Sequence, residues 1–275
     1  MTKIMKFWTG LGVAALSGAV AAGAASVDQE AKGVHSKASG YLLVADAGEG
    51  GEAGSGGEGG EAGSGEETSS RVDYLTDLGL LEGHMRVGVA LAAAGNREAA
   101  LAHMKHPGDE LYDDLKGHFE ELGVPGLADE LAAIARSVEA SAAPAETESA
   151  MQALAVAIAA CRKTPMTSAE TGEAIAGLMR FAADEYGDGV KDGKVVEAHE
   201  YQDAWGFMQT AKAYLAGVPE DERKEHAEAF GEIAAELAKL DAAWPDLSGA
   251  APIAVDPSLL LLAASRIELA ASEIR

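Results

Sequence analysis

Carboxylate and imidazole side chains lie within stripes of this chain that are otherwise apolar. The first stripe repeats at three- and four-residue steps and consists of Leu75, Leu78, Glu82, Met85 and Val89. This spacing puts Glu82 on the apolar face of a predicted helix. A second stripe has the same spacing and consists of Leu111, Leu115, His118 and Leu122. A buried carboxylate is costly unless it is paired or coordinated, so these positions predict either metal ligands or ion pairs.

Seven residues in the first part of the chain form the first candidate metal site. They are Glu82, His84, His103, His106, Asp109, Glu110 and His118. His103 and His106 end a predicted helix just before Pro107, and Glu110 lies one turn into the next. Carboxylate and imidazole together suit iron, zinc, copper or manganese, and helical bundles hold such ions between facing helices. A second interpretation stays open, in which these are core histidines with satisfied hydrogen bonds.

A second candidate lies where an acidic, glycine-containing turn leads into a helix. Its residues are Glu197, His199 and Glu200, with Tyr201 and Asp203 beside them. Residues 184–203 are spaced somewhat like a calcium-binding loop, but Val190 and His199 would occupy positions that need oxygen ligands. The sequence therefore predicts a second transition-metal site here or, alternatively, a turn with solvated acids.

Enzyme motifs are absent from the chain. It contains no GxSxG, HExxH, Walker loop or dinucleotide fingerprint, and it lacks the CxxCH motif of covalent haem attachment. The single Cys161 cannot form an intramolecular disulfide and lies in an Ala-rich run typical of a helix core. We therefore expect a protein without catalytic activity.

The first 70 residues are predicted to lie outside the folded part. Residues 1–25 combine two lysines with a Gly- and Ala-rich apolar run and a small-x-small cleavage site, which indicates a secretory signal peptide and a periplasmic protein. A retained membrane anchor is the alternative interpretation of this segment. Residues 26–70 form a lead and a flexible linker that contains the acidic nonapeptide GEGGEAGSG twice. The net charge of −24 disfavours nucleic acid and anionic lipid as partners and concentrates cations.

The remainder is predicted to be all-α, because it is rich in Ala and has no strand pattern of useful length. We expect a first antiparallel helical module over 71–140, with helices at about 72–94, 97–106, 109–122 and 127–139. A second bundle module is expected over 146–275. Its helices are predicted at about 147–163, 168–187, 196–217, 220–241 and 257–274. Whether the two modules pack together is not decided by the sequence.

A resemblance to a known family is carried by residues 186–202, which read YGDGVKDGKVVEAHEYQ, and by the later segment 265–268, SRIE. This pattern resembles the periplasmic helical domain associated with bacterial high-affinity iron permeases, over roughly Thr167 to Arg275. The Arg-Glu-Gly-Leu-Glu signature of the permease itself is absent, so transport by this chain is excluded. The GxHxxE pattern of related iron-transport lipoproteins is incomplete, because Gly83 and His84 lack the matching Glu.

The resemblance implies a soluble exported helper that binds or presents iron, with copper or zinc as the next choices. A membrane permease or another periplasmic protein would be its partner, and the chain would not insert stably into the membrane after signal cleavage. By position, Glu197, Glu200 and Tyr201 would take over any role of the family motif. The alternative function is a helical-hairpin interaction scaffold without metal, in which inward acids pair with arginines.

Overall fold

The structure is a computed structural model that describes residues 64–109 and 111–275. The predicted signal peptide, most of the predicted linker and Glu110 lie outside these residues. Within the described part the protein is all-α, as the sequence predicts. Here the α-helices are α1 (Ser64–Ala93), α2 (Arg97–Asp109), α3 (Leu111–Leu122), α4 (Ala128–Glu139), α5 (Pro144–Cys161), α6 (Ser168–Gly189), α7 (Ala198–Ala216), α8 (Glu220–Glu225), α9 (Ala227–Lys239) and α10 (Pro257–Ser272).

Two smaller elements complete the described chain. A 3₁₀ helix, η2 (Leu240–Ala243), follows α9, and a hairpin of β1 (Val190–Lys191) and β2 (Lys194–Val195) joins α6 to α7. Asp192 and Gly193 close this hairpin with φ angles of 52° and 71°, as a two-residue hairpin turn requires. None of the described helices is both long and apolar enough to cross a bilayer.

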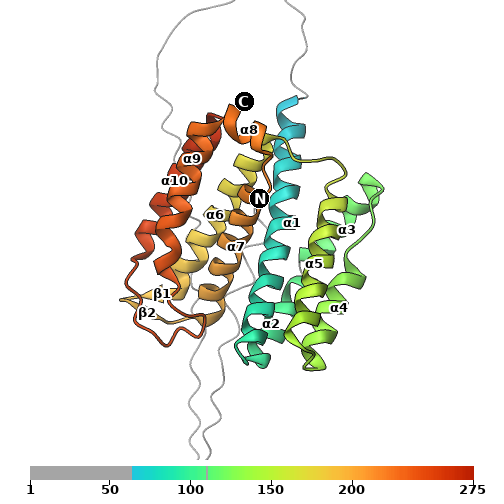
Figure 1. Ribbon diagram of the computed structural model, residues 1–275, viewed down its shortest axis with the longest axis vertical. Helices are drawn as coiled ribbons and strands as arrows, with labels where there is room; N and C mark the ends of the chain where they lie inside the picture. Colours follow the sequence, from blue (N-terminus) through green and yellow to red (C-terminus); the bar gives the residue numbers. More distant parts are fainter. Residues whose placement is uncertain (1–63, 110) are drawn as a thin grey trace, which may run out of the picture. The chain divides into compact units, whose positions relative to one another are not determined.

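Helix α1 is the central element of the described unit (Figure 1). It packs against α6 and α7 of the C-terminal bundle and also against α2 and α5. The C-terminal bundle itself is formed by α6, α7, α9 and α10. The helices of the two predicted modules therefore pack together through α1. Their division into separate modules stays a prediction.

Several helix limits differ from those predicted from the sequence. Helix α1 begins at Ser64, eight residues before its predicted start, so the predicted linker is partly helical. The predicted helix 220–241 is divided at His226, whose φ of −110° and ψ of 39° are not helical. No Pro or Gly marks this break in the sequence.

A pair of glycines brings α1 and α7 into backbone contact. A Cβ atom at Gly206 would overlap the backbone oxygen of Gly83, and one at Gly83 would lie 2.6 Å from Cδ1 of Phe207. Residues without side chains are needed at this crossing because neither backbone has room to retreat within the packed interior. The crossing lies beside His84, the residue after Gly83, and one turn from Asp203.

Candidate metal centre

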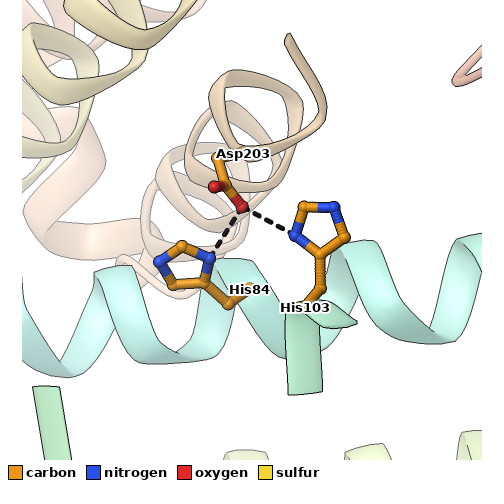
Figure 2. A group of neighbouring side chains, drawn as sticks. All are labelled: His84, His103 and Asp203. Atoms are coloured by element: carbon orange, nitrogen blue, oxygen red, sulfur yellow. Dashed lines mark hydrogen bonds and ion pairs between the residues drawn. The ribbon is translucent and has the colours of Figure 1, made fainter. Parts of the chain in front are cut away.

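Three side chains from three different helices converge beside the glycine crossing. His84 comes from α1, His103 from α2 and Asp203 from α7, and Figure 2 shows both imidazole rings directed at the carboxylate. Nδ1 of His84 lies 2.7 Å and Nδ1 of His103 lies 3.0 Å from the same oxygen, Oδ1 of Asp203. The three potential ligand atoms lie within 4.8 Å of one another. All three residues are buried, with exposed fractions of 2%, 0% and 0%.

The orientation of His103 is set by Gln202, the neighbour of Asp203 on α7. Nε2 of Gln202 donates to the backbone oxygen of Leu247 over 2.7 Å, which directs Oε1 of the amide toward His103. Nε2 of His103 therefore donates to this oxygen over 2.8 Å, while its Nδ1 faces Asp203. An acceptor at each nitrogen favours the protonated form of the ring.

The charges within the cluster support each other. Burial by itself would lower the pKa of His103, but the charge and hydrogen bond of Asp203, helped by Gln202, raise it above the ordinary value. Burial would likewise raise the pKa of Asp203, but His84 and His103 hold it well below its usual range. In the metal-free protein Asp203 is thus a carboxylate that is stabilised by imidazoles, with no lysine or arginine paired to it among the described residues.

A third histidine, His199, lies beside the cluster and is partly exposed to solvent. Nε2 of His199 lies 3.4 Å from Oδ2 of Asp203, and its side chain is 29% exposed. The ring stacks on that of His103 with a centroid distance of 3.9 Å and an interplanar angle of 1°. The Glu200 carboxyl is half-buried and shares a hydrogen bond with Glu185 of α6. The two predicted candidate sites therefore meet: His84 and His103 from the first lie beside His199 and Asp203 from the second.

Other predicted site residues lie outside this cluster. Glu82 is buried as predicted, but its Oε1 accepts hydrogen bonds from Arg86 at 2.5 and 3.1 Å, so it is an ion-paired residue. His118 is half-buried against the ring of Tyr74, 5.3 Å between centroids. Glu197 is exposed at the N-cap of α7.

Tyr201 is buried in the bundle, and its hydroxyl donates to the backbone oxygen of Asp246 over 2.8 Å. His106 and Asp109 belong to the last turn of α2, but their side chains lie outside the described residues, as does Glu110.

Two residues of the site were not selected by the sequence analysis. Glu185 was part of a stretch interpreted as solvated acids, and Gln202 carries no ligand chemistry of its own. What distinguishes Gln202 is its place in the chain, next to Asp203. Gln202 and Asp203 directly follow Tyr201 on α7, within a run of four consecutive buried residues, Tyr201 to Ala204. An amide and a carboxylate in such a run need partners from other elements.

Two imidazole nitrogens and one carboxylate oxygen form a donor set that suits a divalent transition metal. The same combination occurs in mononuclear iron(II) sites that bind the ion on one face and leave other positions open. Replacing the Nδ1 proton of each histidine with a metal ion would leave the Nε2–H bond from His103 to Gln202 in place, which is the usual outer support of a metal-bound histidine.

Fold and site together define an all-helical protein with a buried carboxylate–imidazole cluster between its helices. Residues 162–272 match the family model of the iron permease-associated 4-helix bundle domain, so the C-terminal part of the chain carries this domain. The resemblance stated from the sequence is thereby confirmed for this region, which includes α6 to α10. No curated protein and no solved structure matches the chain. Asp203 lies inside the matched region, whereas His84 and His103 precede it.

Proposed function

We propose that this protein is an exported, non-enzymatic metal-binding protein that serves iron uptake. The observation that carries the proposal is the convergence of His84, His103 and Asp203, three buried ligating groups within 4.8 Å. The matched domain is associated with iron permeases, which makes iron the first choice of metal and a permease the expected partner. Copper and zinc are the next choices, because imidazole and carboxylate ligands suit both.

The chemistry of the cluster supports binding of an ion over catalysis. His84, His103 and Asp203 would hold the metal, and Gln202 would keep His103 in the tautomer whose Nδ1 faces the ion. The chain carries a net charge of −24, which favours cations over anions near the protein. A burial this complete limits access of larger molecules to the ion and suits holding or handing over a metal.

The proposal is tested on the protein purified from the periplasm without chelator or nickel affinity resin. Elemental analysis is followed by anaerobic titration of the metal-free protein with iron(II), zinc and copper(II), read out by calorimetry and thermal unfolding. We expect stoichiometric binding and a rise in Tm, because a ligand bound only by the folded state stabilises it.

A double variant, His84→Gln with His103→Gln, supplies the matched test, since each amide can still donate to Asp203. It should lose the bound metal and keep its helical circular dichroism. His118→Ala is the control, because His118 lies against Tyr74 outside the cluster and its removal should leave binding unchanged. A metal-free native protein that shows no thermal shift with any of the three ions contradicts the proposal.

An interaction scaffold without metal is the second candidate function. It is favoured by other acids that have arginine or lysine partners, such as Glu170 with Arg71 at 2.7 Å and Glu236 with Lys239 at 2.6 Å. The first pair joins α6 to α1, the second lies within α9, and neither needs a metal. The scaffold function becomes the better explanation if the titrations find no ion, and a pull-down with the permease then tests it.

A further inference from the structure

Figure 2 shows both imidazole rings at one oxygen of Asp203, Oδ1, while the second oxygen, Oδ2, makes neither of these contacts. Oδ2 accepts no hydrogen bond from any described residue, although the side chain is only 1% exposed. Nε2 of His199 lies 3.4 Å from this oxygen. A fully buried carboxylate oxygen without a hydrogen bond is uncommon, because leaving it unsatisfied costs free energy. The first proposed metal site uses Oδ1 of Asp203 and leaves Oδ2 available as a ligand.

Two further carboxyl groups face the same region. Glu185, near the end of α6, shares a hydrogen bond with Glu200 in the first turn of α7, and both feel the charge of Asp203. The Oε2 atom of Glu200 is buried and has no hydrogen-bond partner within residues 64–109 and 111–275.

The hairpin between α6 and α7 brings these acids together. Gly189 ends α6 so close to α7 that a Cβ atom there would lie 2.6 Å from the backbone nitrogen of Tyr201. The first turn of α7 is thereby fixed against the last turn of α6, with Glu200 beside Glu185. Three exposed acids, Asp184, Asp188 and Glu197, surround this end of the two helices. They form an acidic surface on the partly exposed side of the site.

We propose that Asp203 Oδ2, His199, Glu200 and Glu185 form a second subsite for a divalent transition metal, so that the Asp203 carboxylate bridges two ions. The inference rests on the proposed metal binding by His84, His103 and Asp203. Each oxygen of Asp203 then has its own cation, and the two unsatisfied carboxylate oxygens acquire partners. Paired sites of this kind, built from Glu, Asp and His on facing helices, are an established use of helical bundles.

Position assigns the two subsites different tasks. His199 and Glu200 are half-buried, whereas His84 and His103 are buried behind them. An ion that enters from the acidic surface meets the outer subsite first, and the bridging carboxylate lies between this subsite and the inner one.

Manganese(II) is the probe for the test, because it binds oxygen and imidazole ligands and its electron paramagnetic resonance reports ion pairs. The metal-free full-length protein is titrated in 0.15 M salt, which screens weak surface binding. Native mass spectrometry and equilibrium dialysis give the stoichiometry. We expect two ions per chain, with spin coupling between them.

The variants separate the two subsites. Glu185→Gln combined with Glu200→Gln keeps the shape of both side chains and should bind one ion, with the uncoupled six-line spectrum. Glu197→Gln is the matched control, because Glu197 is an exposed acid of the same segment, and it should bind two.

The outcomes are distinguishable. One ion in the native protein, unchanged in the Glu185→Gln, Glu200→Gln variant, overturns the second subsite and leaves the first intact. Two ions without spin coupling overturn the bridging role of Asp203. Loss of both ions from a folded Glu185→Gln, Glu200→Gln variant overturns the separation into two subsites. No bound ion in the native protein overturns the proposed function and this inference together.

Discussion

Two buried carboxylates in adjoining helices, Glu82 of α1 and Asp203 of α7, are neutralised in different ways. Glu82 pairs with Arg86 one turn away on its own helix. Asp203 draws on His84 and His103, which come from two other helices, and no Arg or Lys among the described residues pairs with it. Arginine stays charged at all physiological pH values, whereas an imidazole can release its proton and bind a metal ion at the same nitrogen.

This difference separates a structural acid from a candidate ligand. The charge of Glu82 is permanently balanced, so a metal ion there would have to compete with a guanidinium. The charge of Asp203 is balanced by groups that are themselves metal ligands once deprotonated. Burial alone, which the two acids share, therefore does not distinguish them, and the identity of the partner does.

The largest effect is expected when the two acids are exchanged for amides one at a time. Asp203→Asn should abolish metal binding. It should also destabilise the metal-free protein by about 3–5 kcal/mol, because two buried imidazoles lose the carboxylate that pairs with them. Glu82→Gln should retain metal binding and cost about 1 kcal/mol, since Arg86 is partly exposed and can reach water. Calorimetric titration and denaturant unfolding measure both. Loss of metal from Glu82→Gln would remove the distinction between the two acids.

A smaller effect on metal binding is expected from Gln202→Leu. The variant removes the acceptor that keeps Nε2 of His103 protonated, so the ring loses its fixed orientation, and metal affinity should fall roughly 10–100-fold. Thr210→Val is the control, because the Thr210 hydroxyl bonds only the backbone of its own helix at Gly206. Equal affinities for the native protein and Gln202→Leu would show that the orientation of His103 does not depend on the amide.

A third test of the role of Asp203 changes the distance between α1 and α7 at the glycine crossing and leaves the ligands themselves unchanged. Gly206→Ala should separate α1 from α7, stretch the contact between His84 and Asp203, and destabilise the protein by about 1–3 kcal/mol. Gly231→Ala, in α9 with open space around it, should instead stabilise by about 0.5–1 kcal/mol. Thermal unfolding and metal titration of both variants are the measurements. Unaltered metal affinity in a destabilised Gly206→Ala protein would show that the site tolerates movement of α1.

The pH dependence of stability in the metal-free protein provides a further comparison of two acids. Because the pKa of Glu185 is raised from 4.5 to about 11 by folding, its contribution is largest below pH 4.5 and is lost progressively as the pH rises toward 11. Glu185→Gln should therefore gain stability relative to the native protein between pH 5 and pH 8.

Glu236 supplies the opposite case. Although burial opposes it, Lys239 and Arg266 lower the pKa of Glu236, so its contribution is present above pH 4.5 and lost as the pH falls through the folded-state pKa. Glu236→Gln should thus lose stability at neutral pH and approach the native protein in acid. Denaturant unfolding at several pH values checks both signs, and parallel pH profiles for the two variants would contradict the assignment.

Much of the fold follows from local patterns, because helix propensity and end signals act over a few residues. Thr167 and Glu170 form the capping box that begins α6, and Asp256 caps α10 ahead of Pro257. The burial of Glu82 was likewise predicted from its stripe. Its pairing with Arg86 was also accessible, since residues four apart share a helix face.

The site was less accessible because its partners are far apart in sequence. His84 and Asp203 are separated by 119 residues, and helical periodicity cannot tell which faces of distant helices meet. The structure brings His84 and His103 of the predicted group together. His118 was grouped with them because it shares a stripe with leucines, and the structure places it against Tyr74. The crossing of α1 and α7 at Gly83 and Gly206 fixes which histidine reaches Asp203.

The separation between His84 and Asp203 also has a consequence for the unfolded chain. An ion held by both residues closes a loop of more than 100 residues, and in the chain-entropy model a disulfide over such a length stabilises by about 4.7 kcal/mol. With its single cysteine, this protein cannot form such a link covalently within one chain. A bound metal ion would act as a reversible cross-link, so the metal-bound protein would resist proteolysis more than the metal-free protein.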